Sequence, residues 1–263
     1  MPKFCANLTM MFNEVDFLSR FERASRAGFR GVEYLFPYEW DKEQLAEKLA
    51  KHGLEQVLYN LPAGNWPAGE RGIACLPERI GEFREGVGLA IEYAQALKCS
   101  RLNCLVGLTP GGVPEEKARR TLVDNLRFAA SALEKEGIRL LVEPLNNQDI
   151  PGFHLVHTQD TLQLFQEVNH SNLWLQYDIY HMQIMEGNLT KTIKDNLDRI
   201  AHIQLADNPG RHEPGSGEIN YTNLLHFIDE AGYDGWIGCE YKPAGKTEDG
   251  LGWLKSFRKE GGE

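Results

Sequence analysis

The chain has 263 residues, of which 42% are hydrophobic and 25% are charged, and its net charge is −10. These values are typical of a globular protein with the size of one barrel or two small domains. Lys and Arg form no cluster, which argues against a nucleic-acid partner because such binding relies on neutralising phosphates. No apolar run reaches the roughly 18–20 residues of a membrane helix, so we also expect no membrane partner.

The N-terminus and the cysteines indicate where the protein works. Residues 1–7 lack the basic-then-apolar order of a signal peptide, from which we expect a cytoplasmic location. The cysteines are odd in number and without paired spacing, so we predict buried, reduced thiols. They are Cys5, Cys75, Cys99, Cys104 and Cys239.

Short β-rich runs alternate with helical patterns along the whole chain. The predicted strands are residues 3–8, 31–36, 55–61, 101–106, 139–145, 173–178, 200–206 and 235–241. The predicted helices are residues 16–27, 41–51, 78–97, 114–136, 158–168, 189–198, 221–231 and 248–258. A long connection rich in Gly, Pro and Trp, residues 62–77, follows the third strand, and connections of this length are usually functional.

Eight strand-then-helix units without an internal linker predict the α/β class, as a single-domain (β/α)8 TIM barrel spanning residues 1–263. The alternative is a doubly wound parallel sheet, which has similar runs of residues. Such sheets usually carry a glycine-rich phosphate loop after the first strand, and residues 7–12 contain no such loop. The barrel is therefore the favoured architecture.

Four consecutive strands each place an oxygen-bearing side chain near their C-terminal end. These residues are Glu143, Asp178, Gln204 and Glu240. Side chains alternate along a strand, and on strands six to eight the polar residues fall on one parity and the aliphatic ones on the other. Since the chemistry of such barrels lies at the C-terminal rim, we expect the four side chains to converge there.

Carboxylates that converge at one rim raise each other's pKa unless a cation compensates. A set of oxygen donors suits Mg²⁺, with Mn²⁺ as the alternative, and argues against a dedicated zinc site. The competing interpretation is that Glu143 and Glu240 are merely strand-end residues bonded to loop amides.

Further candidates lie in the rim loops. His181, three residues after Asp178 in a predicted strand-to-helix loop, is placed to bond a substrate oxygen. Arg211, in the polar loop after strand seven, is a suitable fork for a small carboxylate. Glu70 and Arg71 form a second charged pair, which could equally be a plain surface ion pair. His202 shares the face of Gln204 but lies deeper, so we predict a hydrogen-bonded interior residue.

Several motifs together resemble the hydroxypyruvate isomerase family of the xylose-isomerase-like TIM barrels, and the resemblance runs essentially end to end. The stretches that carry it are FCANLTMMF (4–12), GVEYLFPY (31–38), NLPAGNW (60–66), AGERGIA (68–74), QYDIYHMQ (176–183), ADNPGRHEPG (206–215) and GWIGCEY (235–241). Many members of the wider superfamily have His at the strand-seven ligand position, where this chain has Gln204. The substrate-binding candidates are His181, Arg211, Arg71 and Glu70.

The resemblance implies interconversion of hydroxypyruvate and 2-hydroxy-3-oxopropanoate, with Glu143 and Glu240 as the acid/base pair. It implies a divalent metal held by Glu143, Asp178, Gln204 and Glu240, and no organic cofactor. Close relatives act on four-carbon 2-oxo-tetronates, which stay open as substrates. Two less favoured functions are a repair endonuclease of the same superfamily and a non-catalytic barrel that binds a sugar acid. The sequence does not fix the oligomeric state, and a homo-oligomer is allowed.

Overall fold

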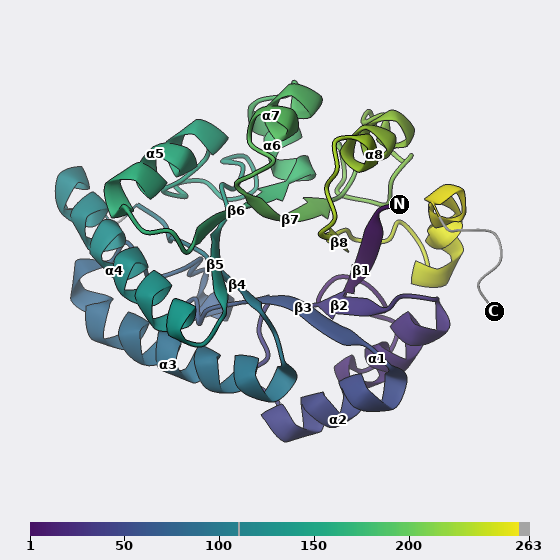
Figure 1. The fold of residues 1–263 in the computed structure, drawn as a ribbon, viewed down its shortest axis with the longest axis horizontal. Coiled ribbons are helices and arrows are strands. Elements are labelled where there is room, and N and C mark those ends of the chain that lie inside the picture. The colour runs from purple at the N-terminus through teal and green to yellow at the C-terminus, as the bar shows by residue number, and fades with distance from the viewer. Residues whose placement is uncertain (110, 258–263) are drawn as a thin grey trace.

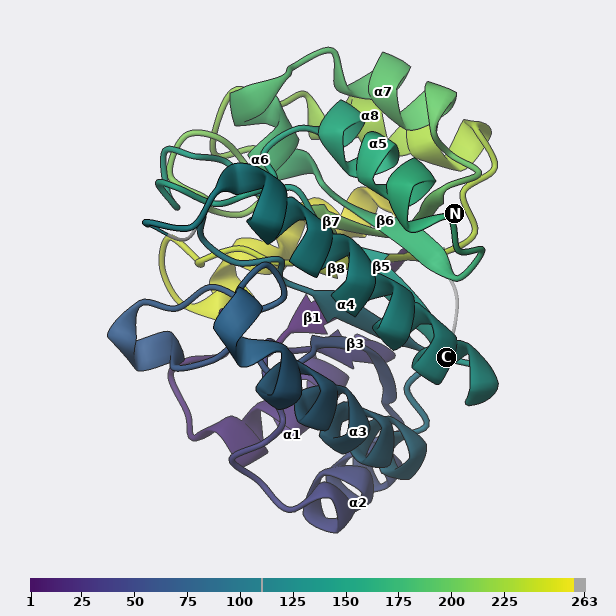
Figure 2. The ribbon, with the colours of Figure 1, turned by 90° about the vertical axis from the view of Figure 1, so that its left-hand side faces the viewer.

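A closed ring of parallel strands organises the molecule. The computed structural model describes residues 1–109 and 111–257. In these ranges eight strands pair in chain order, and β8 closes the ring against β1. Figure 1 shows the strands surrounding the centre and the helices lying outside them, and Figure 2 shows α3 and α4 side by side along one flank. The predicted (β/α)8 barrel is confirmed.

The elements lie close to their predicted positions. The strands are β1 (Lys3–Asn7), β2 (Gly31–Glu33), β3 (Glu55–Asn60), β4 (Arg101–Cys104), β5 (Arg139–Val142), β6 (Leu173–Asp178), β7 (Ile200–Leu205) and β8 (Trp236–Cys239). The α-helices are α1 (Phe17–Arg26), α2 (Lys42–His52), α3 (Ile80–Leu97), α4 (Glu115–Lys135), α5 (Thr158–Val168), α6 (Ile179–Met185), α7 (Leu189–Asp195) and α8 (Tyr221–Glu230).

Two details of the prediction are wrong. Residues 179–185 form the short helix α6, so His181 lies on a helix and not in a loop. The Asp178 side chain accepts a hydrogen bond from the Tyr180 N–H, which starts this helix directly at the strand end. Thr247–Phe257 forms a 3-10 helix in place of the predicted α-helix, in a segment that two glycines make a poor α-helix former. Residue 258 of that prediction lies outside the described residues.

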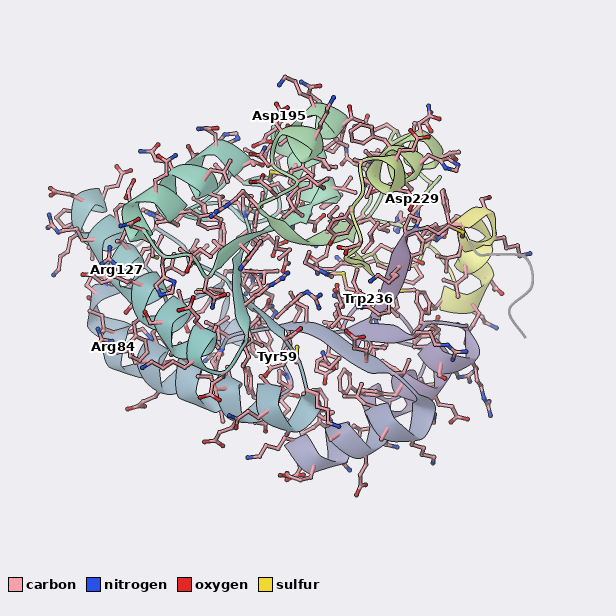
Figure 3. The ribbon with its side chains drawn as sticks, in the orientation of Figure 1. Tyr59, Arg84, Arg127, Asp195, Asp229 and Trp236 are labelled. Atoms are coloured by element: carbon pink, nitrogen blue, oxygen red, sulfur yellow. The ribbon has the colours of Figure 1, made fainter. Side chains whose placement is uncertain are left out.

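Alternation along the strands separates two buried layers. Leu140 and Val142 of β5 pack outward into the main core with the helices. Leu141 points inward and joins a small apolar cluster with Cys5, Val57, Leu58 and Ala201, which fills part of the barrel interior. Figure 3 shows side chains filling the ring of strands, with Arg84 and Arg127 on the helices outside it. The remaining interior is polar, and the candidate site is built on it.

The cysteines and helices agree with two simpler predictions. All five cysteines are buried and free of disulfides. Within the described ranges, none of the helices is long and apolar enough to cross a membrane.

Candidate active site

A cavity of about 80 Å³ opens where the strands end. Its polar lining residues include Glu143, His181, Arg211 and Glu240. Its apolar lining residues include Met10, Leu58, Trp66, Leu105 and Ile150. Sites for drug-sized ligands usually measure about 300–1,000 Å³. The cavity therefore suits a small polar substrate.

Glu143 is the first residue after β5, and its side chain is buried at 4% exposure. Its Oε2 accepts hydrogen bonds from Asn103 Nδ2 (3.1 Å) and Gln176 Nε2 (2.9 Å). Burial raises its pKa well above the usual value, and the nearby charges of Glu240 and Asp178 raise it further. Glu143 therefore favours its protonated form when the other carboxylates are ionised.

Glu240 holds the corresponding place after β8 but has a different environment. Arg211 Nη2 donates to its Oε1 (2.6 Å), while Gln204 Nε2 (2.5 Å) and Asn7 Nδ2 (3.2 Å) donate to its Oε2. Burial raises the pKa of Glu240 to about 8, although the charge of Arg211 opposes the rise. A guanidinium at hydrogen-bond distance makes Glu240 the more easily ionised of the two glutamates.

Asp178 and His181 lie together at the end of β6. The Nε2 of His181 lies 3.6 Å from Asp178 Oδ2, and both side chains are almost completely buried. The backbone N–H of Asn146 donates to His181 Nδ1 (3.2 Å), so the neutral ring carries its proton on Nε2. Burial lowers the pKa of His181 well below its usual value, and Arg211 lowers it further. His181 is therefore a neutral hydrogen-bond donor facing the site.

Arg211 supplies the positive charge of the site. Its backbone has a φ of 57°, and its guanidinium lies over the Tyr180 ring, 5.0 Å from the ring centre. Besides Glu240, its Nη2 reaches Asp178 Oδ2 at 3.5 Å. The Nε of Arg211 is buried without a hydrogen-bond partner in the described part of the chain.

The side-chain amide of Gln204 connects Glu240 to a third glutamate, Glu33. Its Nε2 donates to Glu240 and, at 2.8 Å, to Glu33, whereas its Oε1 accepts a hydrogen bond from Gln176 Nε2 (2.6 Å). In this arrangement the nitrogen faces the carboxylates. Its role as an oxygen ligand stays a prediction.

Glu70 and Arg71 lie beside the cavity and not in its wall. Glu70 pairs with Arg79 at 2.5 Å, and the Arg71 guanidinium stacks 4.0 Å from the centre of the Trp66 ring. Neither is among the residues that line the cavity, whereas Trp66 is. Their direct contact with a substrate stays a prediction, and the geometry offers an indirect route through Trp66.

The donor set fits a divalent cation. Ligand atoms of Glu143, Asp178 and His181 lie within 4.8 Å of one another, and all three residues are buried. Burial raises the pKa of Asp178 and of both glutamates, and Arg211 opposes the rise. When all three carboxyl groups are ionised, the single guanidinium compensates only part of their negative charge. The Oε1 of Gln176, another lining residue, has no hydrogen-bond partner among the described residues. His181 therefore lies next to the position at which the predicted oxygen ligands would hold a cation.

The sequence reasoning missed a buried layer beneath these residues. Glu33 lies 2.6 Å from His202 Nε2, and both side chains have 0% exposure. Burial alone would raise the Glu33 pKa, but His202 and the amide donors outweigh it and lower the pKa. His202 is a hydrogen-bonded interior residue, as predicted. The feature of the sequence that could have identified Glu33 is its position as a charged residue within a short apolar strand.

Comparisons with known proteins identify the family of this chain. The family described as xylose isomerase-like TIM barrel matches residues 21–257. A relative named hydroxypyruvate isomerase, from Escherichia coli, is 57% identical over 98% of this chain and 100% of its own length. A relative named 2-oxo-tetronate isomerase, from Cupriavidus necator, is 46% identical over 98% of this chain and 99% of its own.

Solved structures show the same fold. A Brucella melitensis protein described as AP endonuclease, family 2, has a TM-score of 0.96 and 47% identity, covering 98% of this chain and 100% of the other. The 3-keto-D-glucoside 4-epimerase of Escherichia coli has a TM-score of 0.81 over 97% of this chain and 99% of the other, but at 21% identity it supports the fold alone. The chain belongs to the xylose isomerase-like TIM barrel family.

Proposed function

We propose that this chain is an isomerase that interconverts hydroxypyruvate and 2-hydroxy-3-oxopropanoate (tartronate semialdehyde). The observation that carries the proposal is the pair of buried glutamates, Glu143 and Glu240, that line one small cavity together with Arg211. The name of the relative with 57% identity along the whole chain supports it.

The substrate carboxylate binds at Arg211. Arg211 lines the cavity and supplies the positive charge of the site, and charge-assisted bonds to guanidinium are strong and directional. His181 presents its Nε2–H to a substrate oxygen. These contacts fix the two reacting carbon atoms between the glutamates.

The reaction is a balanced proton shift through an enediol. Glu240 removes a proton from C3 of hydroxypyruvate, and the electrons of the broken C–H bond form the C2–C3 double bond. The π electrons of the C2 carbonyl move at the same time onto the C2 oxygen, which gives an enediolate. Glu143 then delivers a proton to C2, while the proton of the C3 hydroxyl moves to the C2 oxygen and leaves an aldehyde. Positioned acid and base groups of this kind contribute roughly 10²–10⁴-fold to a rate.

Mg²⁺ is the expected cofactor, with Mn²⁺ as the alternative, held by Glu143, Asp178, Gln204 and Glu240. When bound, a divalent cation would polarise the carbonyl and hydroxyl oxygens of the substrate. Gln204 would offer its Oε1, which accepts a hydrogen bond from Gln176, while its Nε2 remains bonded to Glu33 and Glu240. Proton transfer within one small molecule needs no organic cofactor.

A four-carbon 2-oxo-tetronate is the second candidate substrate. The Cupriavidus necator relative bears the name of that activity and is 46% identical over nearly the whole chain. The two substrates differ by one carbon, and a pocket discriminates between such homologues by only about 1–3 kcal/mol. Both candidates need direct comparison.

One NMR experiment tests the proposal. Hydroxypyruvate and a 2-oxo-tetronate are each incubated with the chain in D₂O, with and without Mg²⁺, and product and C–H exchange are followed together. We expect aldehyde formation and deuterium incorporation from hydroxypyruvate, at a higher kcat/KM than for the four-carbon acid. Exchange without product would contradict isomerisation, and binding without exchange would identify a non-catalytic sugar-acid-binding barrel.

A further inference from the structure

Glu33 is a charged residue at a place where barrels usually bury apolar side chains. It ends β2, points into the barrel, and has 0% exposure. Burying a carboxylate is costly unless it is paired and hydrogen-bonded. Glu33 meets this condition through His202 at 2.6 Å, and Cys5 Sγ donates a weak hydrogen bond to it at 3.4 Å.

Two amides join Glu33 to the candidate base. Asn7 Nδ2 donates to Glu33 Oε1 (3.0 Å) and to Glu240 Oε2 (3.2 Å). Gln204 Nε2 donates to the same two oxygens, at 2.8 Å and 2.5 Å. Each NH₂ group therefore donates one hydrogen to Glu33 and the other to Glu240. With these two bonds made, the nitrogen of each amide, and not its oxygen, faces Glu240.

The barrel leaves room for this carboxylate at one glycine. Gly238 lies on the interior face of β8, two residues before Glu240. A Cβ at this position would lie 2.4 Å from each carboxylate oxygen of Glu33. Any larger residue would push Glu33 away from its amide partners.

We propose that Glu33 is a positioning residue for the isomerisation, which fixes the Glu240 carboxylate by orienting the amides of Asn7 and Gln204. Glu33 is not among the residues that line the cavity, so it acts on the substrate only through these side chains. The inference rests on the proposed function of Glu240 as base.

A second metal site is the competing interpretation of the same cluster. Ligand atoms of Cys5, Glu33 and His202 lie within 4.8 Å of one another. The contacts, however, have hydrogen-bond lengths, and the Glu33–His202 distance of 2.6 Å is too short for an ion to lie between the two atoms.

Glu33→Gln keeps the size of the side chain and removes its charge. Substituting a side chain that holds a functional residue in place typically lowers activity by about 10- to 100-fold. We expect kcat to fall by that factor, with KM for hydroxypyruvate changing less than about threefold, because Glu33 does not line the cavity. Glu186→Gln is the matched control, since Glu186 is a partly buried carboxylate that accepts hydrogen bonds from Thr158 and is not among the residues that line the cavity.

Non-additivity separates positioning from general destabilisation. If Glu33 acts through Asn7, Glu33→Gln should lower kcat much less in an Asn7→Ser background than it does in the wild-type chain. All rates are corrected for the folded fraction measured by circular dichroism. Additive losses in both the Asn7→Ser and a Gln204→Ala background, or an unchanged kcat in a folded Glu33→Gln variant, would overturn the proposal. Loss of one bound metal equivalent in Glu33→Gln would favour the second metal site instead.

A measurement on the unaltered chain covers the case in which Glu33→Gln does not fold. The side-chain NH₂ signals of Asn7 and Gln204 should be protected from solvent exchange, because both hydrogens of each group are bonded. Rapidly exchanging signals would refute the proposal. This readout needs no turnover, so it stays informative even if the chain proves inactive on hydroxypyruvate and the proposed function fails.

Discussion

Glu143 and Glu240 have different neighbours, which give the two carboxyl groups different acid–base properties. Glu143 receives its hydrogen bonds from the neutral amides of Asn103 and Gln176, whereas Glu240 also has the guanidinium of Arg211. A positive neighbour favours the ionised form of a carboxyl group, and neutral burial favours the protonated form. These pKa directions support the proposed roles of Glu240 as base and Glu143 as acid.

Single substitutions test this division. Glu240→Gln should lower kcat by about 10²–10⁴-fold and abolish exchange of the C3 hydrogens in D₂O. Glu143→Gln should also stop product formation but retain C3 exchange, because the base is still present. Both variants should keep the wild-type circular dichroism spectrum. Rapid C3 exchange by Glu240→Gln would show that the base has been assigned to the wrong residue.

Arg211→Gln should weaken substrate binding and shift the pH profile. A hydrogen bond to a charged group contributes about 1.5–3 kcal/mol, so we expect KM to rise about 10- to 100-fold. Arg211 also lowers the pKa of Glu240, so its loss should move the rising limb of the rate–pH profile to higher pH. Steady-state kinetics across pH check both effects. An unchanged KM would exclude Arg211 as the carboxylate clamp.

At the scale of elements, the loop after β3 reaches the cavity through one aromatic ring. Trp66 lines the cavity, and Arg71 holds it by stacking and by donating to its backbone oxygen at 3.1 Å. A cation–π contact at a partly exposed position contributes about 0.5–1 kcal/mol. Arg71 can therefore influence the substrate without touching it.

A double-mutant cycle distinguishes this route from direct binding. Arg71→Ala should raise KM about two- to fivefold, in line with the free energy of one cation–π contact. In a Trp66→Ala background the same change should have almost no further effect. Equal effects of Arg71→Ala in both backgrounds would show that Arg71 binds the substrate itself.

Strand periodicity predicted the elements well because each strand is buried on a regular pattern. Asp178 and Gln204 were placed on the interior face by counting residues, and the structure puts both inside the barrel. The Glu33–His202 contact could not be predicted in this way, since β2 and β7 are not neighbours and meet only across the closed barrel. The helix α6 was missed because its apolar residues follow the strand without a break, although Asp178 is a suitable cap.

For the whole molecule, folding brings three carboxyl groups around one guanidinium, in a chain whose net charge is already −10. Glu143, Asp178 and Glu240 lie around Arg211, which compensates only part of their charge when all three ionise. The pKa of Glu240 rises from 4.5 to about 8 on folding. This group therefore contributes stability below its unfolded pKa, and the contribution is lost as the pH rises through about 8.

A bound cation should reverse this loss, since it binds the ionised carboxylates that repel one another. Ligand binding stabilises a fold by RT ln(1 + [L]/Kd), and the apparent Kd for Mg²⁺ should fall as the glutamates lose their protons. We expect the increase in melting temperature caused by Mg²⁺ to be small near about pH 6 and to grow toward about pH 9. Differential scanning fluorimetry across pH measures it, with Ca²⁺ as a comparison ion. Glu240→Gln should flatten the dependence, whereas a Mg²⁺ effect equal at every pH would show that these carboxylates do not hold the cation.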